Sequence, residues 1–391
     1  MKLSYSLPIR VLHITTATVI GGAERMLQKL ITSTDNADFD SRVISLTPRG
    51  PVGEELESAG FKVRHLNATG VTGMVVALPA LVRELRSFAP NIIQGWMYHG
   101  NLAATVAARL ARSAASLLWN IRHSLEDLNN EKRLTAAIIR YSAGFSGKVG
   151  LVIYNSTSSM KQHQAIGYAK ENAMVIPNGF DVRKYRPSEM LRIEVRKQLG
   201  VEESVPLVGL IARYHPIKAH FDFLQAAVVC SHALPEARFM MAGKDIDPLN
   251  RKLVEKIREL RLDEKIILLG ERGDIDRLLP ALDVVALSSV SEGFPNILGE
   301  AMSCGVPCVT TAVGDCAWIV GDTGRVVPPG QPDLLGRAMV DLLMESQPLK
   351  TERGVAARQR IEQLFSLESV VRQYQELYRS QAQTVLPDMI S

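Results

Sequence analysis

The sequence has few cysteines, few aromatic residues and no long uninterrupted apolar run. Its only cysteines are Cys230, Cys304, Cys308 and Cys316 among 391 residues. Four thiols do not form a disulfide framework in a chain of this length, so a reducing compartment is expected. No C-x-x-C pair and no nearby histidine accompanies them, which favours buried thiols over a metal site.

No apolar run approaches the roughly 20 residues that cross a bilayer as a helix. The longest runs, such as 117–121 and 150–154, have the length of strands. At the N-terminus, Pro8, Arg10 and His13 interrupt the apolar residues, which favours a first strand over a signal peptide. We therefore expect a cytoplasmic protein.

Neither sign of charge dominates, since the formal net charge is only +4. The two halves differ, however. Residues 1–183 contain 20 Lys and Arg against 13 Asp and Glu, whereas residues 184–391 contain 25 against 28. The basic first half favours an anionic partner, either a phosphate-bearing acceptor or the anionic inner face of the cell membrane, and no nucleic-acid partner is expected.

Apolar runs of strand length alternate with amphipathic helical patterns, which predicts an α/β protein with mostly parallel sheets covered on both faces. The length favours two domains. We place their boundary near Arg183, after the interruption P-N-G-F-D, and expect domains at 1–183 and 184–365 with a final helix at 366–391. Strands are expected at 9–15, 42–46, 62–65, 91–94, 117–120, 151–155, 174–176, 207–211, 238–242, 265–268, 284–287 and 308–310. Helices are expected at 23–33, 75–88, 101–110, 129–145, 250–260, 296–304, 332–344 and 366–381.

The segment 287–305, L-S-S-V-S-E-G-F-P-N-I-L-G-E-A-M-S-C-G, predicts a strand end, a loop and a helix with Pro295 in its first turn. The free N–H groups and dipole of such a helix attract a phosphate or diphosphate. Glu292 and Glu300 flank this anion site, and carboxylates accept hydrogen bonds from hydroxyls. A nucleotide sugar fits this pattern, although such glutamates often serve only the helix dipole.

Further candidates follow other expected strands, at the edge where open α/β sheets collect ligands. Gly21 and Gly22 follow the first strand, where a plain tight turn is the simpler interpretation. His99 and His123 follow two later strands, and a lone histidine is more often structural.

In the second half, Arg213 and Lys218 follow the strand 207–211 and could bind phosphate oxygens, although basic loop residues are usually just solvated. The turn around Arg272 is a candidate contact for a nucleobase. The D-x-D strings at 245–247 and 274–276 could hold a metal, but Asp is common at helix starts and two helix N-termini already supply positive potential. We therefore expect no metal site.

The segments G-G-A-E-R, R-H-S, I-P-N-G-F-D, A-R-Y-H-P-I-K and E-G-F-P-N-I-L-G-E-A-M together resemble the retaining glycosyltransferases of family 4, whose hallmark is E-x7-E. The resemblance implies the GT-B fold, in which two Rossmann-like, doubly wound domains face each other across a cleft. The second domain would bind the donor and the first the acceptor. One departure is Ala219, where the family commonly has Gly.

The resemblance also implies roles for residues. Arg213 and Lys218 would stabilise the departing diphosphate, Glu292 would position the transferred sugar, His123 would line its reacting face, and Glu300 would bind the ribose. Asp127 is a spare candidate for the general base, and His99 a second candidate on the acceptor side. The implied donor-binding set is Gly21, Gly22, Arg213, Lys218, Arg272, Gly293, Phe294, Pro295, Asn296, Ile297 and Glu300.

No cofactor is expected beyond a UDP- or GDP-sugar as donor substrate, and the acceptor implied is a glycan or a lipid-diphosphate-linked glycan of cell-surface polysaccharide synthesis. Two alternatives remain open: a nucleotide-sugar epimerase of GT-B architecture, and a non-catalytic nucleotide-sugar-binding protein. E-x7-E argues against the first alternative, and the complete set of charged residues against the second.

The expected helix at 129–145 carries Leu134, Ile138, Tyr141 and Phe145 on one stripe, among basic residues such as Arg133. The simpler interpretation packs this stripe on the sheet and leaves a solvated basic face. The alternative is an interfacial helix that contacts anionic lipid.

Overall fold

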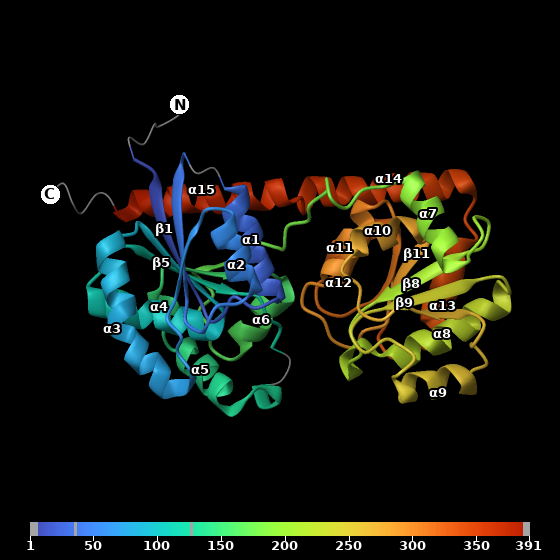
Figure 1. The fold of residues 1–391 in the computed structure, drawn as a ribbon, viewed down its shortest axis with the longest axis horizontal. Coiled ribbons are helices and arrows are strands. Elements are labelled where there is room, and N and C mark those ends of the chain that lie inside the picture. The colour runs from blue at the N-terminus through green and yellow to red at the C-terminus, as the bar shows by residue number, and fades with distance from the viewer. Residues whose placement is uncertain (1–6, 35–36, 126–127, 386–391) are drawn as a thin grey trace. The chain divides into compact units, whose positions relative to one another are not determined.

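The computed structural model describes residues 7–34, 37–125 and 128–385. The chain divides into two compact units (Figure 1). The first combines the residues up to Gly179 with those from Leu367 onward, and the second comprises Phe180–Ser366. The sequence interpretation places this boundary at 183 instead. In the described part of the chain, no helix combines the length and apolar character that a bilayer crossing requires.

The first unit is built on a parallel sheet with the strand order β3-β2-β1-β4-β5-β6-β7. The order reverses direction between β1 and β4, as in a doubly wound fold. The central strands β1 and β4 are almost wholly buried, as their apolar runs predict. The strands are β1 (Ile9–Thr15), β2 (Phe39–Ser45), β3 (Lys62–His65), β4 (Ile92–Trp96), β5 (Ser116–Ile121), β6 (Leu151–Tyr154) and β7 (Ala173–Val175).

Helices cover both faces of this sheet. Apolar residues of α1, α2 and the C-terminal helix α15 pack on one face, and those of α3 and α4 pack on the other (Figure 1). Ser156 caps α6, because its Oγ accepts a hydrogen bond from Ser159 N at 3.1 Å. The helices are α1 (Gly22–Ser33), α2 (Pro51–Ser58), α3 (Gly70–Phe88), α4 (Met97–Ala111), α5 (Arg133–Ala143), α6 (Thr157–Ala165) and α15 (Leu367–Val385), with the 3-10 turns η1 (Leu128–Asn130) and η2 (Ser146–Lys148).

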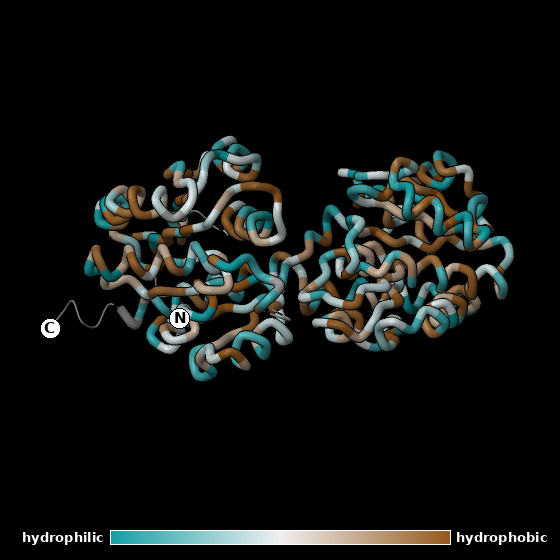
Figure 2. Tube along the Cα trace, turned by 90° about the horizontal axis from the view of Figure 1, so that it is seen from below, coloured by the Kyte–Doolittle hydropathy of each residue, from teal (hydrophilic) through white to brown (hydrophobic). Residues whose placement is uncertain are grey.

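The second unit repeats this architecture around a sheet of order β10-β9-β8-β11-β12-β13, with parallel pairing throughout the described strands. In each unit the hydrophobic strands run inside and hydrophilic stretches lie on the surrounding helices and loops (Figure 2). Strand β11 is completely buried, as an apolar run in a covered parallel sheet should be. The strands are β8 (Leu207–Ile211), β9 (Arg238–Ala242), β10 (Ile266–Leu268), β11 (Val284–Leu287), β12 (Cys308–Thr311) and β13 (Arg325–Val327).

A single large core fills the second unit. Gly305, with φ of +74°, follows the C-terminus of α11 in the left-handed conformation that glycine adopts without strain. The helices are α7 (Glu189–Leu199), α8 (His220–Ala233), α9 (Arg251–Glu259), α10 (Ile275–Leu278), α11 (Asn296–Ser303), α12 (Cys316–Val320), α13 (Pro332–Leu343) and α14 (Gln347–Leu364), with the 3-10 turns η3 (Pro216–Lys218), η4 (Leu279–Ala281) and η5 (Gly321–Thr323).

Two sequence expectations are wrong. The expected helix at 129–145 is the shorter α5, and its buried side is formed by residues such as Ala136 and Ile139. Leu134 and Tyr141 of the predicted stripe are instead 49% and 57% exposed. Pro295 is the N-cap of α11 rather than a residue of its first turn. Helix α14, which has no clear apolar stripe, is absent from the sequence prediction.

Candidate active site

In the second unit, β8 and β11 lie side by side in the sheet although β9 and β10 lie between them in the sequence. Such a switch point opens a crevice at the carboxyl ends of the strands, and ligands bind there in open α/β sheets. The loops that follow the two strands are joined directly. Val290 N donates to Ile217 O at 2.8 Å, and Ser288 Oγ donates to Lys218 O at 2.8 Å. The sequence candidates on these loops are therefore held together.

Lys218 and Glu292 meet at this switch point. Lys218 Nζ lies 2.5 Å from Glu292 Oε1, and their side chains are only 18% and 9% exposed. The Ser289 hydroxyl donates to the same carboxylate oxygen at 2.7 Å. Because the pair is largely buried, it holds a fixed geometry more firmly than a surface ion pair.

The loop that carries Glu292 is braced from the next strand as well. Thr311 Oγ1 donates to Ser289 O at 2.5 Å, and Asp315 N donates to Gly293 O at 2.9 Å. Gly314 has φ of +54°, and a Cβ there would lie 2.2 Å from Glu292 O. Only glycine allows this close approach, so the position of the Glu292 backbone depends on Gly314.

Helix α11 begins at Asn296, directly beyond Pro295. The first N–H groups of α11, including those of Asn296 and Ile297, have no earlier helical turn to bind. The Phe294 side chain is buried and stacks on Phe180 with ring centroids 6.0 Å apart. Any contact of Phe294 or Gly293 with a ligand therefore comes from the backbone.

Glu300 lies in the second turn of α11. The Tyr185 hydroxyl hydrogen bonds to this carboxylate, and burial together with the Glu300 charge raises the pKa of Tyr185. The hydroxyl therefore stays protonated and donates to Glu300. A ligand hydroxyl could bind the remaining lone pairs of the carboxylate.

Arg213 is exposed and lies in the loop after β8, the same loop that carries Lys218. The neighbouring strand approaches this loop closely, since a Cβ on Gly243 would lie 2.2 Å from Ala212 O. Arg272 follows β10 at the far edge of the sheet. Its guanidinium binds Asp274 in a fork at 2.8 and 2.6 Å, and this hydrogen bonding holds the pKa of Asp274 below its usual value. The charge of Arg272 is therefore already paired with that of Asp274.

The first unit brings its own candidates to the carboxyl edge of its sheet. Gly21 is the N-cap of α1 after β1, and a Cβ on Gly22 would meet nothing within 4 Å. Space therefore remains at Gly22 for a ligand to approach. His99 lies in the first turn of α4 after β4, and partial burial lowers its pKa.

His123 follows β5, and its side chain is 42% exposed. Its Nε2 lies 2.7 Å from Glu131 Oε1. Asp127, the spare candidate for a general base, lies outside the described residues. Among the described residues, no group of three or more His, Cys, Asp and Glu side chains is placed to hold a metal ion.

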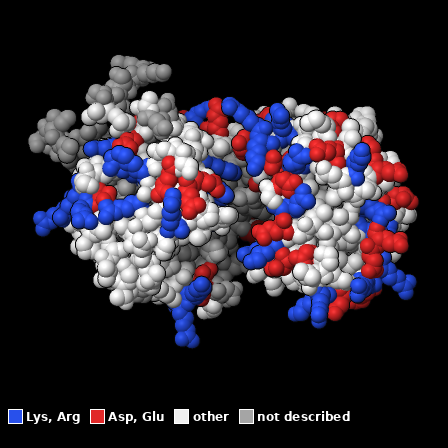
Figure 3. Space-filling model, viewed as in Figure 1, with Lys and Arg blue, Asp and Glu red and all other residues white. Residues whose placement is uncertain are grey.

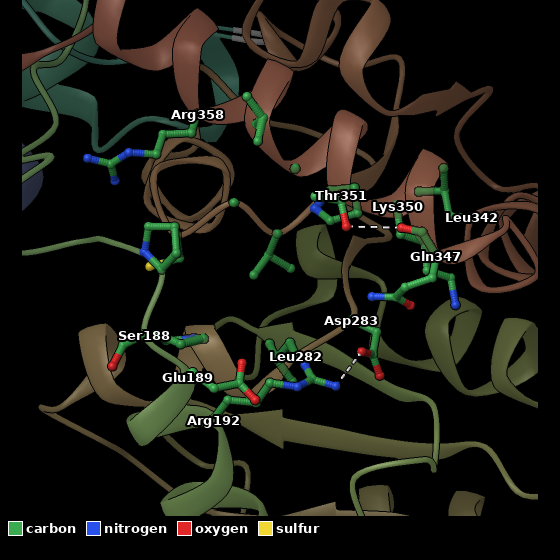
Figure 4. A pocket seen from close by; sticks show the side chains of 18 of the residues that line it. Ser188, Glu189, Arg192, Leu282, Asp283, Leu342, Gln347, Lys350, Thr351 and Arg358 are labelled. Atoms are coloured by element: carbon green, nitrogen blue, oxygen red, sulfur yellow. Dashed lines mark hydrogen bonds and ion pairs between the residues drawn. The ribbon is translucent and has the colours of Figure 1, made fainter.

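A separate cavity of about 860 Å³ lies within the second unit (Figure 4). Pro206, Asp283 and Pro307, which immediately precede β8, β11 and β12, line it together with residues of α7 and α14. The cavity is therefore at the amino ends of the strands, the edge opposite to the switch-point crevice. Arg192 in its wall is bound to Asp283 at 2.9 Å, so part of its charge is compensated within the lining.

The fold and these loops define a two-domain α/β protein whose second Rossmann-like unit has a switch-point site with basic and carboxylate side chains. The sequence-family model for glycosyl transferases group 1 matches residues 205–345. The family model for glycosyltransferase family 4 matches residues 20–184. The chain belongs to these group 1, family 4 type glycosyltransferases and has their GT-B fold. This confirms the family and the fold class inferred from the sequence motifs.

Named relatives and solved structures agree with this assignment. The chain is 24% identical over 321 residues to the Escherichia coli UDP-Gal:alpha-D-GlcNAc-diphosphoundecaprenol alpha-1,3-galactosyltransferase, covering 80% of this chain and 81% of the relative. It is 27% identical over 211 residues to the Bacillus anthracis N-acetyl-alpha-D-glucosaminyl L-malate synthase, of which the match spans only 54%. The structure of Anabaena HepE in complex with UDP superposes with a TM-score of 0.82 at 24% identity, covering 95% of this chain and 100% of HepE.

Sequence reasoning missed the side chains that hold the candidates in place. Ser289, Tyr185 and Glu131 contact Glu292, Glu300 and His123 respectively. Ser289 stands three residues before Glu292 in the segment 287–305, and this closeness in the sequence was a usable signal. Nothing in the spacing of Tyr185 pointed to Glu300, because a separate segment of the chain brings it there.

Proposed function

We propose that this chain is a retaining, metal-independent glycosyltransferase that moves a hexose-type sugar from a nucleoside-diphosphate sugar to a glycan or lipid-diphosphate-linked acceptor. The observation that carries the proposal is the Lys218–Glu292 pair at the switch point, where the loops after the adjacent strands β8 and β11 also carry Arg213 and lead into α11. Basic side chains and helix N–H groups suit a diphosphate, and carboxylates suit sugar hydroxyls.

In this proposal, the site stabilises the negative charge that develops on the departing diphosphate. Arg213 can bind phosphate oxygens in a fork, Lys218 adds a compact charge, and the N-terminus of α11 adds a dipole. Such interactions strengthen as the glycosidic bond breaks, so they lower the barrier. Since they already supply positive potential, the proposal requires no metal ion.

The remaining roles concern hydroxyl groups. Glu292 positions hydroxyls of the transferred sugar, Glu300 binds the ribose, and His123 contacts a hydroxyl of the sugar substrate. In this proposal a donor phosphate oxygen takes the proton of the acceptor hydroxyl, so no side-chain base is needed. Retention rests on the E-x7-E motif, which is shared with retaining enzymes.

UDP-sugars are the first donors to test. HepE has been solved with UDP-glucose, and the E. coli relative is named as an enzyme that uses UDP-Gal. That relative and a lipopolysaccharide core mannosyltransferase of Rhizobium meliloti also support a role in cell-surface polysaccharide synthesis.

The proposed donor site can be tested by thermal unfolding with UDP-, GDP- and ADP-sugars in the presence of EDTA. At one hundred times Kd, the ligand adds about 2.7 kcal/mol of stability, which raises the midpoint measurably. We expect one nucleotide class to raise the midpoint of the wild type but not that of Arg213→Ala. Arg251→Ala, an exposed arginine at the start of α9, is the matched control. No shift with any donor would contradict the proposal.

A second measurement separates the transferase from its alternatives. Incubation of the active donor with lipid-diphosphate-linked glycans should yield a product whose anomeric proton has the same configuration as the donor. Release of a modified nucleotide sugar without an acceptor would indicate an epimerase instead. Binding without any turnover would indicate a non-catalytic protein.

We further place the first unit at the anionic face of the membrane, through the exposed side of α5. Leu134 and Tyr141 project from that side next to Arg133 and Arg140. Apolar side chains among basic residues suit the interface of an anionic bilayer. The face drawn in Figure 3 also has a broad area without charged side chains over α3, which exposes Val75 and Val76.

Liposome sedimentation tests this contact. The wild type should sediment with vesicles that contain anionic lipid and much less with neutral vesicles, and added salt should release it. Replacing Arg133 and Arg140 by Glu should abolish sedimentation. Replacing Arg251 and Lys252 of the second unit by Glu should leave it intact. Unchanged binding of the α5 variant would remove the membrane contact from the proposal.

A further inference from the structure

His123 is fixed from three directions within the first unit. Its carbonyl accepts a hydrogen bond from Ser159 Oγ at 2.6 Å. The Tyr98 ring meets the imidazole edge-on, with centroids 6.1 Å apart and an interplanar angle of 87°. Glu131 Oε1 lies 2.7 Å from Nε2. Ser159 and Tyr98 therefore hold the backbone and the ring plane of His123. Of these three neighbours, only Glu131 hydrogen bonds to a ring nitrogen.

The support behind His123 is rigid because a second histidine anchors it. His163 is fully buried; its Nδ1 lies 2.7 Å from Ser159 O and its Nε2 lies 2.8 Å from the Tyr98 hydroxyl. A carbonyl oxygen only accepts, so His163 Nδ1 carries the proton and Nε2 accepts from Tyr98. Burial lowers the pKa of His163 to about 4, so this neutral form persists near neutral pH.

His123 has the opposite tautomer. A carboxylate only accepts, so Nε2 of His123 carries the proton that binds Glu131. In the neutral ring, Nδ1 then carries a lone pair. The ring is partly exposed, which lets Nδ1 accept a hydrogen bond from a ligand hydroxyl.

We propose that Glu131 is a positioning residue, which fixes the Nε2–H tautomer of His123 so that Nδ1 accepts a hydrogen bond from a hydroxyl of the sugar substrate. The proposal rests on the proposed function, since it gives His123 a sugar to contact. A plainer role is available to Glu131, because an acidic residue shortly before α5 also complements the helix dipole. The two roles predict different measurements.

The tautomer can be read without any enzymatic assay. Long-range proton–nitrogen correlation spectra of histidine-labelled full-length protein, recorded near pH 8 where free imidazole is neutral, distinguish Nε2–H from Nδ1–H rings. We expect His123 to be Nε2–H and His163 to be Nδ1–H in the wild type. In Glu131→Ala, the His123 signals should shift toward a mixture, while those of His163 stay unchanged as an internal reference. A His123 ring that is Nδ1–H in the wild type, or unchanged in Glu131→Ala, overturns the proposal.

Kinetics with UDP-glucose or UDP-galactose then test the consequence. A misdirected imidazole costs on the order of ten- to a hundredfold in kcat, with a smaller change in donor KM. Glu131→Ala should cause this loss of kcat when His123 is present, but no further loss when it is combined with His123→Ala. Glu131→Asp should recover part of it, and Glu171→Ala, which removes an exposed acid elsewhere in the unit, should lose nothing.

Failure of the proposed function and failure of the positioning role give different results. If the tautomers are as stated but no sugar is transferred, the proposed function fails and the positioning contact stands. If transfer occurs and Glu131→Ala lowers kcat equally in both backgrounds, or lowers only the unfolding midpoint, Glu131 acts through α5 and the positioning role is wrong.

Discussion

Lys218 and Glu292 form an ion pair at the switch point of the second sheet, with Nζ 2.5 Å from Oε1 and both side chains largely buried. The two residues have separate roles in the proposed reaction, one toward the diphosphate and one toward the sugar. Their contact means that neither role is independent. A diphosphate that binds Lys218 shares the ammonium with the Glu292 carboxylate.

Glu292→Gln should therefore separate binding from catalysis. Removing the carboxylate charge leaves the Lys218 charge uncompensated, so the nucleoside diphosphate should bind about three- to tenfold more tightly. Transfer should nevertheless fall by about a hundredfold, because the sugar loses its positioning group. Calorimetry with UDP or GDP and a turnover assay measure the two effects. Unchanged or weaker diphosphate binding would show that Glu292 does not restrain Lys218.

Arg213→Ala should lower kcat by an amount equivalent to about 2 to 4 kcal/mol of transition-state stabilisation. The guanidinium is exposed, so its loss should leave the unfolding midpoint nearly unchanged. Steady-state kinetics and thermal unfolding check both statements, with Arg251→Ala as the control for removal of an exposed arginine. If only donor KM changed, Arg213 would contribute to binding of the donor in the ground state and not to stabilisation of the leaving group.

Glu300→Gln should raise donor KM more than it lowers kcat, since ribose contacts are alike in the ground and transition states. Tyr185→Phe removes the hydroxyl that donates to Glu300 and should raise donor KM in the same direction by a smaller factor. Comparing the ribonucleotide with its 2′-deoxy form gives a direct readout of the ribose contact. If both variants kept the wild-type donor KM, Glu300 would have no part in ribose binding.

Gly314→Ala should disturb both the loop that carries Glu292 and the stability of the fold. The substitution forces φ of +54° on alanine and places its Cβ 2.2 Å from Glu292 O. We expect a loss of about 1 to 3 kcal/mol in the free energy of unfolding, measured with urea, and reduced turnover. Gly273→Ala is the control, because a Cβ there meets nothing within 4 Å. Equal stability of the two variants would contradict the close approach.

The stability of the protein should fall in mild acid through His13. This histidine is buried against Trp96, whose indole donates to Nδ1 at 3.2 Å, and Tyr378. Burial lowers the pKa of His13 from 6.5 to about 3. Below pH 6.5, His13 therefore binds a proton in the unfolded chain but not in the folded chain. Stability is therefore retained above that value and lost as the pH falls. The contribution of this one group between about pH 7.5 and 5 is about 2 kcal/mol.

Urea unfolding of the wild type and of His13→Gln at several pH values measures this contribution. The variant should be less stable at pH 7.5 because of its altered packing, yet it should lose about 2 kcal/mol less than the wild type on acidification. Parallel pH profiles for the two proteins would show that another group controls acid sensitivity.

Much of the second unit follows from its sequence. Val284–Leu287 is a short apolar run that serines follow, and it forms the buried strand β11 as expected. The loops carrying Arg213, Lys218 and Glu292 could be assigned to one edge because the carboxyl ends of parallel strands share an edge. The pairing of Lys218 with Glu292 could not be predicted, since it depends on the reversal of strand order that brings β8 beside β11.

Helix α5 shows why amphipathic patterns can mislead. Two residues of its most obvious apolar stripe, Leu134 and Tyr141, face solvent, whereas the smaller Ala136 lies on the buried side with Ile139. A stripe indicates that a helix has an apolar side, but not which neighbour covers it. Helix α14 escaped prediction for the opposite reason, because its buried side offers little more than Ala357 and Ile361 while Val355 is an exposed apolar residue elsewhere on the helix.

The meeting of Phe180 with the end of α14 has a consequence for how this protein can be rearranged. Phe180 N donates to Phe365 O at 2.9 Å, and Phe180 pairs with Ser366 in a parallel bridge. The first and last residues of the second unit are therefore neighbours, and the unit is an insert within a first unit that is continued by α15. An insert whose ends meet can be excised or exchanged without stretching the host chain. The corresponding unit from another member of the family could be exchanged at these two junctions as a single segment.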